Sequence, residues 1–182
     1  INNTGQLVGF ASTCGNVASH AFFWTASTGM IDIGTLGGSH SFPQSITDAG
    51  QVVGSAATVG GASHAFVWTQ DAGMIDLGTL GGSDSWPYLV NDAGQVVGTS
   101  YIGSGGIYHA FSWTPSTGMI DLGTLGGSYS TPYGINDAGE VVGNAHIPGD
   151  VAAHAFVWTQ ANGMVDLGTL GGTHSQAVTI NN

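Results

Sequence analysis

One stretch of 19 residues recurs four times along the chain, and this recurrence constrains the fold more than any other feature. In its last copy the stretch reads HAFVWTQANGMVDLGTLGG from His154. Equivalent copies begin at His20, His64 and His109, so successive copies are separated by 44, 45 and 45 residues. A period of roughly 20 to 50 residues is typical of solenoids, propellers and other repeat arrays.

A second motif lies a fixed distance before the first one. It reads INNTGQLVG from Ile1, ITDAGQVVG from Ile46, VNDAGQVVG from Val90 and INDAGEVVG from Ile135. Together the motifs describe a single repeat domain. Its units are 1–45, 46–89, 90–134 and 135–179, with 180–182 opening a fifth copy. Because the chain begins within a repeat, we expect it to be a processed or excised region of a longer protein.

Each unit predicts four short strands joined by tight turns. In the last unit Asp137 suits the start of a hairpin turn, and Gly139 suits its left-handed position. Glycine interrupts every apolar run and no stretch has a helical period, so we expect no helix. The expected strands of this unit are Ser130–Asn136, Glu140–Ala145, His154–Thr159 and Met164–Leu170.

Four short strands in about 45 residues are typical of a propeller blade, and the predicted fold is therefore all-β, a four-bladed β-propeller. The segment Thr173–Asn182 would supply the first strand of the blade whose remaining strands begin the chain. In this arrangement both termini complete one blade. The alternatives are an open repeat array, or a filament in which the last strand pairs with the next molecule.

The motifs HAFVWT, GMIDLGTLGG and VNDAGQVVG also carry a family resemblance. They resemble the HAF-type extracellular repeat family of bacteria, and the resemblance covers essentially the whole chain. It implies an extracellular or cell-surface location and implies no reaction.

The charge composition excludes several classes of function. The 182 residues contain no lysine and no arginine, against ten aspartates and Glu140, which gives a net charge of −11. Without a basic residue the chain has no group to neutralise phosphates, so nucleic-acid binding and binding to anionic membrane surfaces are not expected. Cys14 is the only cysteine, so no internal disulfide can form. No apolar run is long enough to cross a membrane as a helix.

Residues that recur in every unit are expected to be structural. The histidines could pair with the aspartates of the next strand, and the tryptophans are expected to be core. Asp48, Asp92 and Asp137 are expected to stabilise their own turns through their side chains. Four equivalent copies do not make the single asymmetric constellation that catalysis requires, so no catalytic residue and no metal ligand is assigned. These repeat positions are His20, His64, His109, His154, Trp24, Trp68, Trp113, Trp158, Asp32, Asp76, Asp121 and Asp166.

Residues that break the repeat are better candidates for binding. In an antiparallel meander alternate loops share one edge, and the variable segments all fall on the same predicted edge. Trp86 is the only tryptophan outside the repeat position. Aromatic rings with a few polar groups suit a sugar or an apolar partner. The candidate ligand-binding residues are His40, Phe42, Asp84, Trp86, Tyr88, Tyr129, Tyr133 and His174, with Tyr101, Tyr108 and His146 in neighbouring loops.

The sequence therefore predicts a non-enzymatic extracellular module with a structural or adhesive role, one able to self-assemble through its terminal strand. The alternative is a module that binds carbohydrate or another ligand on its variable edge. No cofactor is expected. A divalent cation such as calcium is conceivable, but no motif with the spaced oxygen ligands of a calcium loop supports it.

Overall fold

The computed structural model describes residues 1–182, and the fold is all-β. Two single 3₁₀ turns, η1 (Cys14–Asn16) and η2 (Pro148–Asp150), are the only helical segments. No helix is long and apolar enough to cross a membrane. The strands are β1 (Leu7–Ser12), β2 (Ser19–Thr25), β3 (Gly29–Asp32), β4 (Gly37–Ile46), β5 (Val52–Thr58), β6 (Ser63–Thr69), β7 (Gly73–Asp76), β8 (Ser85–Val90), β9 (Val96–Tyr101), β10 (Tyr108–Thr114), β11 (Gly118–Asp121), β12 (Ser130–Ile135), β13 (Val141–His146), β14 (Ala153–Thr159) and β15 (Gly163–Asp166).

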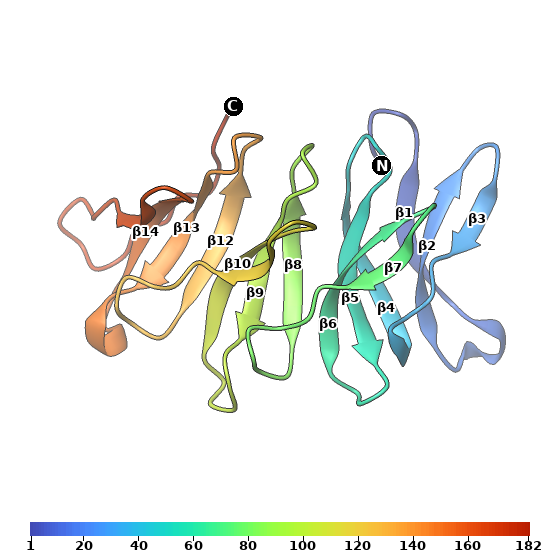
Figure 1. Cartoon of the computed structure of the whole chain (residues 1–182), viewed down its shortest axis with the longest axis horizontal. Helices are drawn as coiled ribbons and strands as arrows, with labels where there is room; N and C mark the ends of the chain where they lie inside the picture. The colour runs from blue at the N-terminus through green and yellow to red at the C-terminus, as the bar shows by residue number, and fades with distance from the viewer.

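The strands form four antiparallel meanders, which stand side by side in a row (Figure 1). Sheet 1 contains β1–β3, sheet 2 contains β4–β7, sheet 3 contains β8–β11 and sheet 4 contains β12–β15. A single parallel bridge between Ser19 and His40 links sheets 1 and 2. By their place in the repeat, β4, β8 and β12 are the first strands of their sheets, and β1, β5, β9 and β13 are the second strands. The turns after the first strands lie at the top of Figure 1 and the loops after the second strands at the bottom, as the meander predicts.

The predicted strands are present, but the last strand of each sheet is shorter than the sequence predicts. In sheet 4 the expected strand Met164–Leu170 ends at Asp166. The Asp166 carboxylate accepts a hydrogen bond from the Gly168 N–H at 2.7 Å, and Gly168 adopts a φ of 69°. This Asx turn breaks the ladder and directs the chain toward the position of the following unit.

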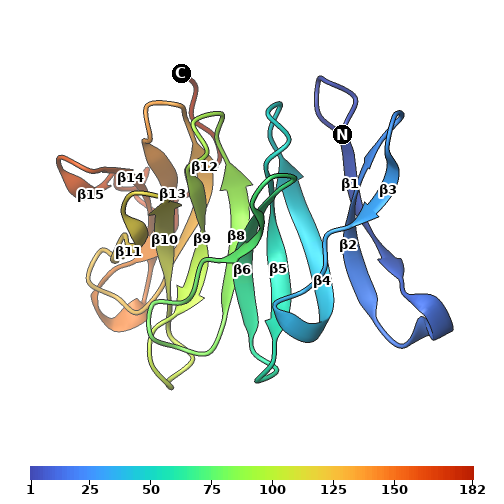
Figure 2. The same cartoon turned by 45° about the vertical axis from the view of Figure 1, so that its right-hand side comes forward.

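The ring closure by both termini that the sequence predicts is not present. Residues 173–182 form no hydrogen bond with β1 and lie instead against sheet 4, where the Ser175 N–H donates to the Ala153 carbonyl at 3.0 Å. Figures 1 and 2 show sheet 1 and the sheet that contains β12–β15 at opposite ends of the row. The tail binds the sheet that precedes it in the chain, as β4, β8 and β12 bind theirs, through a serine hydroxyl that recurs at the same place in each of these segments.

The hydrophobic cores lie between neighbouring sheets. We call the side of a sheet that faces the next sheet in the chain its forward face, and the opposite side its rear face. Between sheets 2 and 3 the forward face of sheet 2 packs on the rear face of sheet 3. The forward side contributes Ala65, Val67 and Leu77, and the rear side contributes Val96, Phe111 and Trp113. The same pattern recurs in the other two interfaces. Trp68, Trp113 and Trp158 are buried, as predicted, whereas Trp24 is half-buried because no sheet covers the rear face of sheet 1.

The glycine of each VVG motif and the phenylalanine of each HAF motif pack directly on each other. A Cβ on Gly98 would lie 2.9 Å from Cε1 of Phe111 and 2.0 Å from the Trp86 carbonyl oxygen. Gly54 and Gly143 have the same two kinds of neighbour. Only glycine therefore allows the first strand and the phenylalanine ring to approach the second strand this closely.

A buried serine in each first strand binds the preceding sheet. Ser85 Oγ accepts a hydrogen bond from the Ala65 N–H at 2.8 Å and donates to the Gly78 carbonyl at 2.6 Å. Ser41, Ser130 and Ser175 make the equivalent pairs of bonds. These hydroxyls place each first strand against the sheet before it.

The turn aspartates do not close their own turns, contrary to the prediction. The preceding residue does so, as when Asn91 Oδ1 accepts the Gln95 N–H at 2.8 Å. Two of the three, Asp48 and Asp137, instead accept hydrogen bonds from the turn of the preceding unit. Asp137 Oδ1 accepts the Asp92 N–H at 3.1 Å, and Asp48 accepts both the backbone and the side-chain N–H groups of Asn3. Asn3 lowers the pKa of Asp48 through these two bonds, the side-chain one first.

Candidate functional site

The first strands of the sheets lie next to one another and form the inner side of the row. β4 contacts both β1 and β8, and β8 contacts β12, whereas β3, β7, β11 and β15 lie on the outer side. Along each first strand the side chains alternate between buried and accessible. In β8, Ser85 and Pro87 are buried, while Trp86 and Tyr88 are partly accessible. We call the accessible residues of this side the inner face.

Each first strand contains a β-bulge immediately after its proline. The register shifts between Pro43 and Ser45, between Pro87 and Leu89, and between Pro132 and Gly134. Proline has no N–H to donate, and within sheets it occurs at edges and bulges. The bulged residue has no partner on the neighbouring strand, so its side chain is re-aimed. The three re-aimed residues are Gln44, Tyr88 and Tyr133.

A cavity of about 310 Å³ lies on the inner face between sheets 2 and 3. Phe42 lies on the sheet 2 side, and Trp86 and Tyr88 lie on the sheet 3 side. Gln44 and Ser55 add a carboxamide and a hydroxyl to the lining, and Pro87 completes it. The sequence selects Phe42, Trp86 and Tyr88 as binding candidates, and the structure brings these three residues together. We call this space the aromatic cavity.

The aromatic cavity lies between two groups of ring contacts. On the sheet 2 side Phe42 meets Phe10 edge to face, with ring centroids 5.3 Å apart. The sheet 3 side continues as a series of rings in contact toward sheet 4. The successive centroid distances are 5.3 Å for Trp86–Tyr101, 6.5 Å for Tyr101–Tyr108, 5.0 Å for Tyr108–Tyr129 and 5.2 Å for Tyr129–His146.

The phenol groups of the inner face also lie close to one another. Burial raises the pKa of Tyr133, and the neighbouring phenols of Tyr108 and Tyr88 raise it further. Tyr88 Oη lies 3.0 Å from Thr99 Oγ1, which fixes the ring at the cavity. Phe42 and Tyr133 remain 43% and 38% exposed, so a ligand can reach these rings from solvent.

Five of the eight predicted binding residues lie outside the lining of the aromatic cavity, and two of them, Tyr129 and Tyr133, belong to the neighbouring group of rings and phenols. The Asp84 carboxylate accepts the Ser63 N–H at 2.7 Å and the Ser83 hydroxyl, so it secures the end of sheet 2. His40 is in the strand that bridges sheets 1 and 2, and its ring is 6.4 Å from that of Phe42. His174 is exposed on the tail, with Nδ1 2.8 Å from Thr173 Oγ1.

The structure adds three residues that the sequence analysis missed, namely Phe10, Gln44 and Ser55. Phe10 occupies a position where the other units carry Ser55, Thr99 and Asn144, and it is 62% exposed. This large apolar residue among small polar ones was the available signal. Gln44 and Ser55 could not be selected without the bulge and the strand register.

The four predicted His–Asp pairs form. The Nδ1–carboxylate distances are 2.9 Å for His20–Asp32, 2.9 Å for His64–Asp76, 2.8 Å for His109–Asp121 and 2.9 Å for His154–Asp166. Partial burial acts to raise the pKa of Asp121, but bonds from His109 and the Gly123 N–H outweigh it, and the net pKa is lowered. Asp32 behaves in the same way. The Gly168 N–H, followed by His154, lowers the pKa of Asp166.

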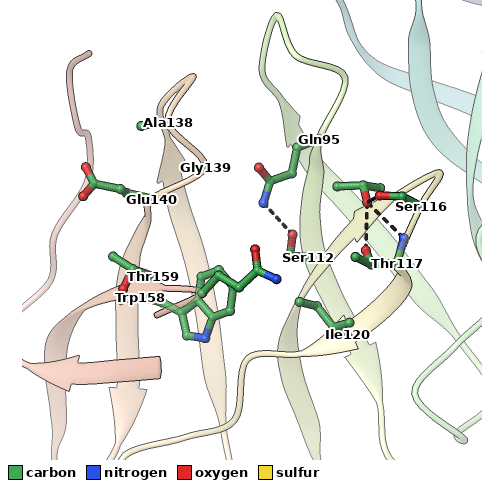
Figure 3. A pocket seen from close by; sticks show the side chains of 12 residues that line it. Gln95, Ser112, Ser116, Thr117, Ile120, Ala138, Gly139, Glu140, Trp158 and Thr159 are labelled. Atoms are coloured by element: carbon green, nitrogen blue, oxygen red, sulfur yellow. Dashed lines mark hydrogen bonds between the residues drawn. The ribbon is translucent and has the colours of Figure 1, made fainter. Parts of the chain in front are cut away.

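A second, polar cavity of about 220 Å³ lies between sheets 3 and 4 (Figure 3). Ser112 replaces the phenylalanine or valine that the other units carry at this position, and it accepts a hydrogen bond from Gln95 Nε2 at 2.7 Å. Trp158 lies across the cavity, whereas the Glu140 carboxylate points away from Gln95 in this view and accepts a bond from Asn136. No group of three or more His, Cys, Asp or Glu side chains is placed to hold a metal ion.

Comparison with known proteins supports the fold alone. No family model matches the chain, and no curated protein matches it significantly. Among solved structures, the chain is similar to TolB from Acinetobacter baumannii, with a TM-score of 0.57 and 16% sequence identity. The similarity covers 90% of this chain and 40% of the TolB chain. TolB is a β-propeller, and this chain therefore has a propeller-like all-β fold built from repeated sheets.

Proposed function

We propose that this chain is a non-enzymatic adhesive module that binds neutral carbohydrate in the aromatic cavity. The four sheets act as blades of an open propeller-like array, and the module works outside the cell or on its surface, as the family resemblance implies. The observation that carries the proposal is the convergence of Phe42, Trp86 and Tyr88 on one cavity with Gln44 and Ser55.

The chemistry of this lining favours a sugar over other small ligands. Sugars present apolar C–H faces that pack on aromatic rings, together with hydroxyls that bond to carboxamides and hydroxyls. A volume of about 310 Å³ suits one ring of an oligosaccharide. The contiguous rings from Trp86 through Tyr101 and Tyr108 would extend the contact along the chain of the ligand.

The charge of the molecule favours a neutral sugar. A net charge of −11 with no lysine or arginine repels anionic ligands and provides no group to pair with them. Catalysis is disfavoured because the aromatic cavity has no carboxylate or histidine in its lining. The His–Asp pairs are equivalent in all four units, which supports a structural role for them.

The test is a binding screen against neutral oligosaccharides, followed by calorimetry with any ligand that the screen identifies. Trp86→Ala should abolish binding and leave the melting temperature nearly unchanged, because the ring is partly accessible. Gln44→Ala should weaken binding about tenfold, which corresponds to one lost hydrogen bond. Gln70→Ala, an exposed glutamine in a turn of sheet 2, is the matched control. Binding of the Trp86→Ala variant with wild-type affinity would contradict the proposal.

A further inference from the structure

The polar cavity between sheets 3 and 4 exists because one core position carries a serine. The residues at this repeat position are Phe23, Val67, Ser112 and Val157. Between sheets 1 and 2 the Phe23 ring is buried, and its centroid lies 5.2 Å from that of Trp68. Between sheets 3 and 4 the smaller Ser112 leaves a space of about 220 Å³. This interface therefore has room for a ligand where the interface between sheets 1 and 2 is filled.

Ser112 is a polar residue at a buried position, and its hydroxyl hydrogen is unused. The residue is only 2% exposed. Its Oγ accepts a hydrogen bond from Gln95 Nε2 at 2.7 Å, but the hydroxyl donates to no group of the chain. A buried donor without an acceptor destabilises a fold. A ligand in the cavity that accepts a hydrogen bond would satisfy this hydroxyl.

A second departure from the repeat lies at the same cavity. Glu140 is the only glutamate of the chain, and it occupies the position where the other units carry Gln6, Gln51 and Gln95. Its carboxylate Oε2 accepts a hydrogen bond from Asn136 Nδ2 at 2.8 Å, and Oε1 accepts none. This residue therefore adds a negative charge to the cavity lining at a position where the other units have a neutral carboxamide.

The rest of the lining combines an aromatic ring with neutral polar groups. Figure 3 shows Gln95 and Ser112 on the sheet 3 side, and Trp158 and Glu140 on the sheet 4 side. Threonine and serine hydroxyls from the turns above complete the lining. The cavity thus offers one carboxylate, one indole and several groups that can form hydrogen bonds with hydroxyls.

The charge of this cavity favours a cation. No lysine, arginine or histidine lines the cavity, so no group of the chain neutralises the Glu140 carboxylate there. The indole of Trp158 attracts a cation through the negative face of its ring. The net charge of −11 also draws cations from solution toward the molecule. A ligand that carries an ammonium group would therefore match this lining better than a neutral one.

We propose that the polar cavity between sheets 3 and 4 binds a small amino alcohol, the chemical class that includes the amino sugars. The ammonium group of the ligand lies between the Glu140 carboxylate and the Trp158 indole. One ligand hydroxyl accepts the hydrogen bond from Ser112, and another bonds to the Gln95 carboxamide. The site lies between two four-stranded sheets and is separate from the aromatic cavity of the inner face. This inference does not depend on carbohydrate binding in the aromatic cavity.

The experiment is isothermal titration calorimetry of the 182-residue chain with glucosamine at about pH 6, where an amine of this kind is protonated. Glucose has the same ring with a hydroxyl in place of the amine and is the neutral comparison. Glucosamine should bind, and glucose should bind at least about tenfold more weakly, because it lacks the charge. Added salt should weaken the binding of glucosamine, since salt screens attraction between charges. Equal affinity for the two sugars, or no binding of glucosamine, would overturn the proposal.

Two variants restore the residues that other units carry at these positions. Glu140→Gln should weaken glucosamine binding at least about tenfold. Asp71→Asn removes one charge from an exposed turn of sheet 2 and should leave binding nearly unchanged. Ser112→Val fills the cavity and should abolish binding, while the melting temperature stays the same or rises.

Ser112→Ala removes the hydroxyl but keeps the space, so it replaces the valine variant if that variant does not fold. It should weaken binding about tenfold through the lost hydrogen bond. Wild-type affinity in Ser112→Val or in Glu140→Gln would overturn the proposal. An equal loss of affinity in Asp71→Asn and Glu140→Gln would also overturn it, because the charge would then act without a local site.

Discussion

Ser130 Oγ lies 2.8 Å from the Ala110 backbone nitrogen and accepts its hydrogen bond across the gap between sheets 3 and 4. The same hydroxyl donates to the Gly123 carbonyl at 2.6 Å. Ser130→Ala leaves both groups without this partner at a buried position. We expect it to lower the free energy of unfolding in urea by about 1–3 kcal/mol. Ser104→Ala, in an exposed loop, should change it by less than about 0.5 kcal/mol. Equal effects of the two substitutions on the free energy of unfolding would show that the Ser130 hydroxyl does not stabilise the contact between sheets 3 and 4.

Gly98→Ala tests the close approach of the first and second strands. The new methyl group would lie 2.0 Å from the Trp86 carbonyl oxygen and 2.9 Å from the Phe111 ring. Because the backbone must shift to admit this methyl group, we expect the free energy of unfolding measured in urea to fall by about 3 kcal/mol or more. Gly105→Ala has no atom within 4 Å of its new Cβ and serves as the control. A small effect of Gly98→Ala would show that β8 and β9 can move apart without a loss in the free energy of unfolding.

Thr47→Asn should add a missing bond between sheets 2 and 3. In the other turns an asparagine side chain donates to the next turn, as Asn91 Nδ2 does to the Asn136 carbonyl at 2.9 Å. Thr47 has no carboxamide N–H with which to make this bond. We expect the asparagine to raise the free energy of unfolding by about 1 kcal/mol, since it would donate to the Asn91 carbonyl. The reverse change, Asn91→Thr, should lower it by a similar amount.

Acid should destabilise the fold in a defined range of pH. The pKa values of Asp32, Asp121 and Asp166 are lowered in the folded chain. A lowered pKa stabilises the fold fully above the unfolded value of about 3.9, and this contribution is lost as the pH falls through the folded pKa. Urea unfolding between pH 6 and pH 2 should therefore show the loss below about pH 4. Asp121→Asn should be less stable at pH 6 and lose less on acidification. An unchanged acid loss in this variant would exclude Asp121 as a contributor.

The raised pKa of Tyr133 can be measured by spectrophotometric titration. Burial and the phenols of Tyr108 and Tyr88 disfavour the Tyr133 phenolate. The phenolate absorbance of the folded chain should therefore contain a component that appears above about pH 10, the ordinary tyrosine value. Tyr133→Phe should remove that late component and leave the rest. Loss of an early component instead would show that Tyr133 does not lie among the other phenols.

The order of the strands and most of their ends could be predicted because the signals are local. The Asp-Ala-Gly turn, the alternation in HAFVWT and the glycines that end each apolar run act within a few residues of one another. The His–Asp pairing could also be expected, because the hairpin pairs Asp32 with Phe22 and so places His20, two residues before Phe22, on the same face and diagonal to Asp32. The last strand was predicted too long, because the Asx turn at Asp166 leaves no mark in the apolar pattern.

Two features could not be read from the sequence. Ring closure depends on the small rotation from each sheet to the next, and no motif determines that angle. The composition of the aromatic cavity depends on the bulge after Pro43 and Pro87, which re-aims Gln44 and Tyr88. Phe42 and Trp86 could be selected because aromatic residues stand out against the repeat. Ser55 lies in a different strand, and its place in the lining depends on the register between strands.

The position of the cores between the sheets has a consequence for how such a chain can change in length. No unit of about 45 residues has a core of its own, so a unit alone has no neighbouring sheet against which to bury its apolar side chains. Loss or duplication of a whole unit removes or adds one interface between sheets and leaves the other interfaces unchanged. The free energy of unfolding should therefore change in nearly equal steps. The residues at the interfaces between sheets recur in every copy, whereas the residues of the inner face differ from copy to copy. Genetic duplication can therefore lengthen the molecule while the inner face of each new copy changes independently of the contacts between sheets.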